Sequence, residues 1–136
     1  MIKLCYKEYD YKLTTGAKKY FFDKTELDLA TVFTDYIVAF VNKRDGAGGF
    51  EQMQGYAKLH SRKTASLALY SIIKECNTNV PLDEIYDATS RVDWLLSDRP
   101  DDLSEPWPFV MLNTALDIND YCNKNTPKKK EVASGI

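Results

Sequence analysis

The segment of residues 59–76 constrains the fold most strongly, because its apolar residues recur with the i, i+3, i+4 spacing of one helix face. The residues that follow this spacing are Ala65, Ala68, Leu69, Ile72, Ile73 and Cys76. The residues expected on the opposite, polar side are Arg62, Lys63, Ser66, Lys74 and Glu75. A helix with one such apolar stripe needs other elements to cover it, so the segment predicts a helical domain with a shared core.

Three further helices are predicted at residues 26–43, 81–96 and 106–123. Thr25 is the expected N-cap of the first, followed by Glu26 and Asp28, whose charges suit a helix N-terminus. The second half of this helix contains "YIVAFV" at 36–41 and is apolar nearly all round. We therefore expect it either deep in the core or in a contact between subunits.

Prolines mark the start of the other two predicted helices. Pro81 suits the first turn of the helix at 81–96. In "SEPWPFVMLN" at 104–113, Ser104 can cap, and Pro106 and Pro108 both fit a first helical turn, where a missing N–H costs nothing. Trp107 is thus fixed at the start of the last helix, as a core residue or as a docking residue.

The N-terminal stretch "KLCYKEYDYKLTTGA" alternates loosely between apolar and polar residues and predicts one or two short strands, closed by Gly16. The expected fold is mainly α, with about four helices in a compact or elongated bundle and a short N-terminal β segment or hairpin. We expect a single helical domain over residues 1–123 and a polar, disordered tail over 124–136.

Charge and composition argue against two classes of function. The chain of 136 residues has 18 Lys and Arg against 20 Asp and Glu, without the basic excess of a general nucleic-acid binder. Its longest apolar run is far short of the roughly 20 residues that cross a bilayer, and no signal-peptide core is recognisable. We therefore expect neither a membrane nor a nucleic-acid partner.

The three cysteines, Cys5, Cys76 and Cys122, lie far apart and form no disulfide framework, which favours a reducing cytosol. Cys76 and Cys122 fall on apolar helical faces, where a thiol is expected to serve as a small hydrophobe.

No catalytic or metal-binding pattern is recognisable. The one histidine, His60, precedes "SRK" without a partner motif and is interpreted as a surface or capping residue. The cysteines and His60 lack zinc-ligand spacing, and the acidic loop around Asp101 and Asp102 lacks the ligand pattern of a calcium loop. The segment "DGAGGF" at 45–50 lacks the spacing of a phosphate-binding loop. We expect no enzyme activity, no metal and no cofactor.

Three stretches carry a resemblance to a known family. They are "YDYKLTTGAKKYFFDKTELDL" at 9–29, "VPLDEIYDATSRVDWL" at 80–95 and "PWPFVMLNTALDINDYC" at 106–122. Together they resemble the tail assembly chaperones of long-tailed, lambdoid-type bacteriophages.

The resemblance implies a helical protein of the infected host's cytoplasm, or of a prophage, that is absent from the finished virion. Such chaperones coat the tape measure protein, help to recruit tail tube subunits, and are often made with a longer, frameshifted form of themselves. The stretch "TPKKKE" is compatible with a slippery codon run. A homo-oligomer is expected, because an elongated client needs a repeated binding surface.

The expected protein-binding residues are the aromatic anchors Trp94, Trp107 and Phe109, with Asp101 and Asp102 in a polar rim. The alternative for the aromatic residues is that they fill the core. Two other functions stay open. One is a structural head–tail joining or tail completion protein that remains in the virion. The other is a helical DNA-binding regulator with a basic patch at Lys58, Arg62 and Lys63.

Overall fold

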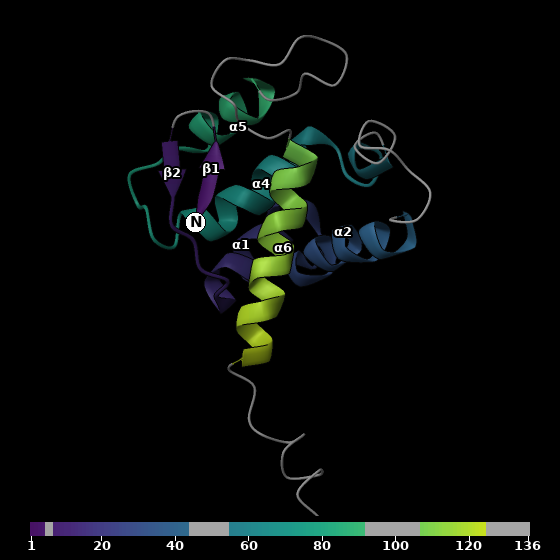
Figure 1. Cartoon of the computed structure of the whole chain (residues 1–136). Coiled ribbons are helices and arrows are strands. Elements are labelled where there is room, and N and C mark those ends of the chain that lie inside the picture. Colours follow the sequence, from purple (N-terminus) through teal and green to yellow (C-terminus); the bar gives the residue numbers. More distant parts are fainter. Residues whose placement is uncertain (5–6, 44–54, 92–106, 125–136) are drawn as a thin grey trace, which may run out of the picture.

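The computed structural model describes residues 1–4, 7–43, 55–91 and 107–124 (Figure 1). Its elements are β1 (Ile2–Leu4), β2 (Lys7–Tyr9), α1 (Thr15–Thr25), α2 (Leu29–Lys43), α4 (Arg62–Ile73), α5 (Leu82–Arg91) and α6 (Trp107–Lys124). Residues 55–57 form one more short helical segment. The expected mainly α-helical fold with an N-terminal hairpin is confirmed, with about six helices in place of about four.

Helix α4 lies at the centre of the fold. Residues 65–69 are all buried, which is more than one full turn, so the helix is covered on every side over this length. It packs against α1, α5 and α6. Ser61 caps its N-terminus by accepting a hydrogen bond from the backbone N–H of Thr64 at 3.1 Å. The predicted helix at 59–76 is therefore confirmed, with shorter bounds.

The N-terminal hairpin is joined to this centre. Strands β1 and β2 pair antiparallel with Ile2 opposite Tyr9, and β1 contacts α5 and α6. After β2, the backbone N–H of Lys12 donates to the carbonyl of Ile72 at 3.0 Å. The amide of Asn77 donates to the carbonyl of Asp10 at 2.8 Å. The polar backbone that follows the hairpin is thus satisfied by the C-terminal end of α4 and the turn after it.

Helices α2 and α6 pack against each other, and α2 also contacts α1. In Figure 1, α6 crosses in front of α4, and α2 extends away from it at one side. The predicted helices at 26–43, 81–96 and 106–123 correspond to α2, α5 and α6. Lys124, where the expected tail begins, is the last residue of α6, and the rest of the expected tail, 125–136, lies outside the described residues.

Helix α1 was not predicted, and it changes the role of Thr25. Thr14 caps α1 by accepting from the N–H of Ala17 at 3.0 Å, so Gly16 belongs to its first turn and closes no strand. Thr25 ends α1, and its hydroxyl donates to the carbonyl of Phe21. The expected N-cap role of Thr25 is therefore wrong. Asp28 performs it for α2, by accepting from the N–H and the hydroxyl of Thr31 at 2.9 and 2.8 Å.

Two residues assigned to the faces of α4 lie elsewhere. Cys76 follows the end of the helix and is exposed, so its expected role as a small buried hydrophobe is wrong. Ser66 was placed on the polar side but is buried, and its hydroxyl shares a 2.7 Å hydrogen bond with that of Thr89 in α5. The expected burial of Cys122 falls on a side chain that the structure does not describe.

None of the helices in the described part of the chain combines the length and the apolar character that a membrane crossing requires.

Leu69 in α4 tests the central position of this helix, because its side chain is completely buried. We expect Leu69→Ala to lower the free energy of unfolding by about 2–5 kcal/mol, through lost burial and the cavity that is left. Leu116→Ala in α6 is the matched control, since Leu116 is 39% exposed; its effect should stay within about 1 kcal/mol. Equal effects of the two substitutions in urea denaturation would contradict the central position of α4.

Candidate protein-binding surfaces

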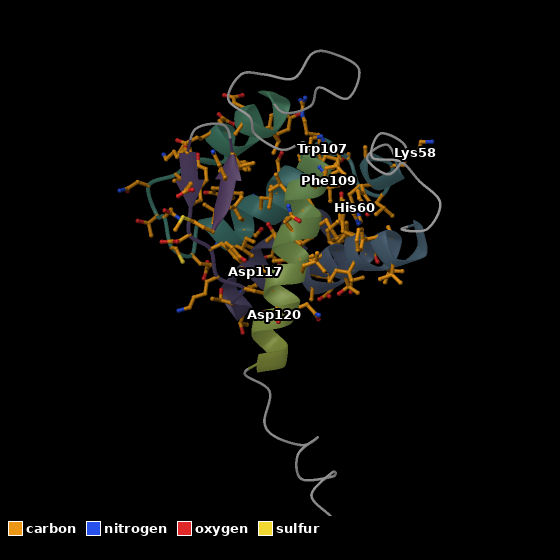
Figure 2. The ribbon with its side chains drawn as sticks, in the orientation of Figure 1. Lys58, His60, Trp107, Phe109, Asp117 and Asp120 are labelled. Atoms are coloured by element: carbon orange, nitrogen blue, oxygen red, sulfur yellow. The ribbon has the colours of Figure 1, made fainter. Side chains whose placement is uncertain are left out.

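Trp107 begins α6 and is buried. Its side chain is 3% exposed, and the indole Nε1 has no hydrogen-bond partner among the described residues. Pro108 beside it is also buried. Figure 2 shows Trp107 at the first turn of α6. In this conformation Trp107 is a core residue, so a docking role would require α6 to open at this end.

Phe109 is half-buried and belongs to a chain of aromatic contacts. Its ring meets Tyr56 edge to face, with ring centroids 5.7 Å apart, and Tyr56 lies 6.1 Å from Tyr36 of α2. These rings join the start of α6 to α2 through residues 55–57. Phe109 therefore contributes to packing, while part of its surface stays open to a partner. Trp94, Asp101 and Asp102 lie outside the described residues.

His60 lies against α2 and does not cap α4. Its side chain is 14% exposed, its ring centroid lies 5.7 Å from that of Tyr36, and its Nε2 lies 3.4 Å from Oδ2 of Asp35. The expected surface or capping role is therefore wrong, because Ser61 is the cap and His60 packs beside an aromatic ring. In the ranges that the model describes, no three His, Cys, Asp or Glu side chains are grouped to hold a metal ion.

The second half of α2 is apolar and only partly covered. Val38 is 50% exposed and Val41 is 47% exposed. Ile37, Ala39 and Phe40 are only partly buried. We call residues 37–41 the α2 apolar segment. Of the stretch at 36–41, Tyr36 is fully buried in the core, whereas the α2 apolar segment does not lie deep in the core, and the other expectation, a contact between subunits, stays a prediction.

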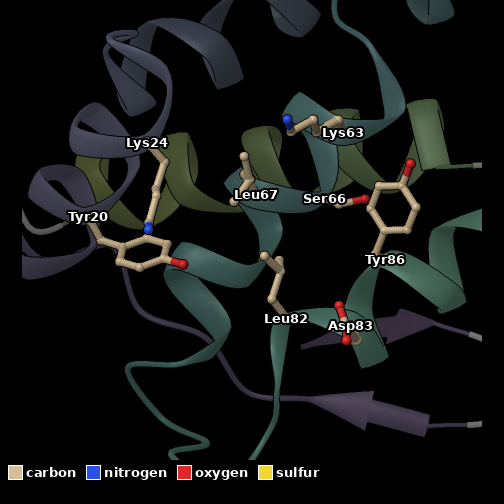
Figure 3. Close-up of a pocket in the computed structure, with 8 residues that line it drawn as sticks. All are labelled: Tyr20, Lys24, Lys63, Ser66, Leu67, Leu82, Asp83 and Tyr86. Carbon is tan, nitrogen blue, oxygen red and sulfur yellow. The ribbon is translucent and has the colours of Figure 1, made fainter.

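A pocket of about 550 Å³ lies between α1, α4 and α5 (Figure 3). Its lining residues are Tyr20, Lys24, Lys63, Ser66, Leu67, Leu82, Asp83 and Tyr86. We call it the tyrosine pocket. Sequence reasoning did not find it, because its residues come from three helices and share no local spacing. Lys63 was noted only as part of a basic patch.

Two carboxylates near the ends of helices accept hydrogen bonds from lysine side chains and from hydroxyl groups. Glu75 accepts from Lys74 at 2.7 Å and from the hydroxyl of Thr14 at 2.6 Å, and these hydrogen bonds lower its pKa below the usual value. Glu84 accepts from the hydroxyl of Tyr9 and from Lys7, which lower its pKa in the same way. Both therefore favour the ionised form in the folded state.

The third such contact joins the start of the chain to α6. The hydroxyl of Tyr11 donates to Asp117, and burial together with this hydrogen bond raises the pKa of Tyr11. Both effects favour the protonated form of Tyr11, which donates the hydrogen bond. Figure 2 shows Asp117 on the face of α6 below Phe109.

Comparisons of the chain with protein-family models, with curated proteins and with solved structures found no match.

Trp107→Ala separates a core role from a docking role. Because the side chain is 3% exposed, we expect the substitution to lower the free energy of unfolding by about 3–5 kcal/mol. Trp107→Phe is the control: it keeps an aromatic ring and removes the unpartnered N–H, so it should cost much less. An unchanged melting temperature for Trp107→Ala, measured by circular dichroism, would contradict its core position.

Glu75 gives a pH-dependent prediction. Since folding lowers its pKa, its contribution to stability is fully present above the unfolded-state pKa, which is near the ordinary value of 4.5. It is lost as the pH falls through the lower, folded-state value. Glu75→Gln should therefore destabilise the chain at pH 7, and the difference from the wild type should shrink below about pH 4.5.

Urea denaturation at several pH values measures this difference. Glu8→Gln is the control, because it removes an exposed carboxylate from the hairpin. A stability difference between the wild type and Glu75→Gln that stays constant from neutral to acidic pH would contradict the assigned role of Glu75.

Proposed function

We propose that this chain is a tail assembly chaperone of a long-tailed bacteriophage or prophage. It binds the tape measure protein and helps to recruit tail tube subunits in the cytoplasm of the bacterial host, and it is not retained in the virion. The proposal is supported by the resemblance of residues 9–29, 80–95 and 106–122 to that family. Of the structural observations, the one that carries it is the exposed α2 apolar segment.

The physical demand of the function matches this segment. A chaperone of an elongated helical client needs apolar surface that is open before the client binds, with polar residues around it. In α2 the exposed valines Val38 and Val41 lie three positions apart, on one side of the helix. Thr34 and the partly exposed Asp35 precede them on the same helix.

The binding free energy available from this surface is small, which favours binding by many copies of the chain at once. Full burial of a valine side chain gains about 1.5–3 kcal/mol, so covering the exposed halves of Val38 and Val41 gains about that amount together. A dissociation constant of about 1 mM already needs about 4 kcal/mol. One such contact is therefore weak, and stable coating of a client requires many linked copies, which fits a homo-oligomer. The same weakness lets the chaperone leave when tube subunits arrive.

A structural protein of the head–tail joint or the tail tip is the other candidate, because it would use the same kind of surface. The two candidates differ in whether the chain remains in the finished virion. The chaperone is missing from purified virions and is found with the tape measure protein, and with its own longer form, in infected cells. Mass spectrometry of both fractions distinguishes them.

Val38→Asp tests the chaperone role of the α2 apolar segment. Co-expressed with the tape measure protein of the same phage genome, the wild-type chain should keep that protein in the soluble fraction. Val38→Asp should lose most of this effect, because binding would bury a charge without a partner. Its melting temperature should change little, since Val38 is 50% exposed.

Thr34→Asp is the matched control, because it places the same charge at an exposed position one turn earlier in α2. It should keep the tape measure protein soluble. If both variants solubilise the client as well as the wild type does, the α2 apolar segment is not the client-binding surface.

A further inference from the structure

The tyrosine pocket has the layered arrangement of a binding site. Its floor is formed by Ser66 and Leu67, which are buried in α4. Partly buried Tyr20 and Tyr86 form opposite walls (Figure 3), and Leu82 lies between them. The exposed side chains of Lys24, Lys63 and Asp83 form the rim. An apolar, aromatic centre inside a charged rim is the usual anatomy of a protein-binding hot spot.

The walls of the pocket are held in place before anything binds. Tyr20 meets Tyr70 edge to face at 5.7 Å between ring centroids. Arg62 lies over the ring of Tyr86, with its guanidinium carbon 4.6 Å from the centroid, and donates to the Tyr86 hydroxyl at 2.9 Å. Fixed aromatic walls lose little conformational freedom on binding, which favours affinity.

Positive charge surrounds these walls. Nζ of Lys24 lies 5.6 Å from the centroid of Tyr20, and Nζ of Lys74 lies 4.9 Å from the same ring. With Lys63 on the rim and Arg62 on Tyr86, cations lie against both walls. Among the eight lining residues Asp83 is the acidic one, and Glu75, which lies near Tyr20 through Lys74, is paired with that lysine. Two lysines against one aspartate give the pocket lining a net charge of +1, whereas the chain has a net charge of −2.

From this arrangement we propose that the tyrosine pocket binds an acidic peptide segment of a partner protein, which places an apolar side chain on Leu67 and Leu82 and its carboxylates on Lys24 and Lys63. The apolar surface of Leu67 and Leu82 selects against a bare phosphate chain, which has no apolar group to cover it. The lysine rim repels a basic peptide, and it favours an acidic peptide over a neutral one because a carboxylate brings a full opposite charge to Lys24 and Lys63.

The inference deepens the proposed function, and it rests on that function for the identity of the partner. The α2 apolar segment would hold the client through apolar contacts, and the tyrosine pocket would bind acidic stretches of the same client.

A short fluorescent peptide of alternating glutamate and leucine is the probe, and fluorescence anisotropy measures its affinity for the chain. The matched peptide carries glutamine in place of glutamate. The wild-type chain should bind the acidic peptide at least about tenfold more tightly, and added salt should weaken this binding.

The double variant Lys24→Glu with Lys63→Glu reverses the charge at two rim positions and should weaken binding of the acidic peptide about tenfold or more. Asp83→Asn removes the acidic rim group and should strengthen it severalfold. The matched control is Lys19→Glu with Lys58→Glu, which changes the net charge equally at exposed positions outside the pocket lining. This control should stay within about threefold of the wild type.

Three results would overturn the inference. The first two are equal weakening of acidic-peptide binding by the control pair, and equal affinity of the wild-type chain for the acidic and the glutamine peptide. The third comes from single-stranded DNA as a second probe: the wild type binds it, and the variant Lys24→Glu with Lys63→Glu loses this binding but still binds the acidic peptide. Its failure is separable from failure of the chaperone role. If Val38→Asp abolishes solubilisation of the tape measure protein while the peptide assay shows no pocket effect, only the pocket inference fails. If peptide binding depends on the pocket but the wild-type chain leaves the client insoluble, the chaperone role fails.

Discussion

Burial of α4 on every side is the constraint on which the rest of the structure depends. Because residues 65–69 are all buried, α1, α5 and α6 each cover part of this helix, and the tyrosine pocket reaches Ser66 and Leu67 between α1 and α5. The chain after the hairpin is tied to its C-terminal end by the hydrogen bond from Lys12 to Ile72. Helix α2 is placed differently. It packs against α1 and α6, and its second half extends beyond the cover they provide, which leaves Val38 and Val41 half-exposed.

The sequence predicts those helices that their own residue pattern is sufficient to identify. The regular apolar spacing of residues 59–76 predicts α4, and the prolines at 106 and 108 predict the start of α6. Helix α1 could not be predicted in this way, because only Ala17 and Phe21 of its residues are buried and its aromatic-rich sequence is equally typical of a strand. The buried position of Ser66 depends on Thr89 of another helix, which periodicity does not reveal.

The candidate sites were less predictable, for two physical reasons. An apolar half-helix such as residues 37–41 has the same sequence pattern in a protein core and in an interface. Only its solvent exposure in the structure distinguishes the two. The tyrosine pocket is assembled from three helices, and nothing local in the sequence connects Tyr20 with Tyr86. Trp107 shows the converse: its aromatic type and fixed position are compatible with a core residue and with a docking residue, and the structure buries it in the core.

Taken together, these features describe a buried helical centre with two unlike surfaces, one apolar on α2 and one lined by tyrosine and lysine side chains between α1, α4 and α5. The central claim is that the apolar surface receives a client while the centre stays closed. Hydrogen–deuterium exchange of the chain, alone and with the tape measure protein, tests it most directly. The account predicts that the amides of residues 37–41 become slower to exchange when the client binds, while those of α4 are the slowest in both states. Unchanged exchange at 37–41, or opening of α4 on binding, would contradict it.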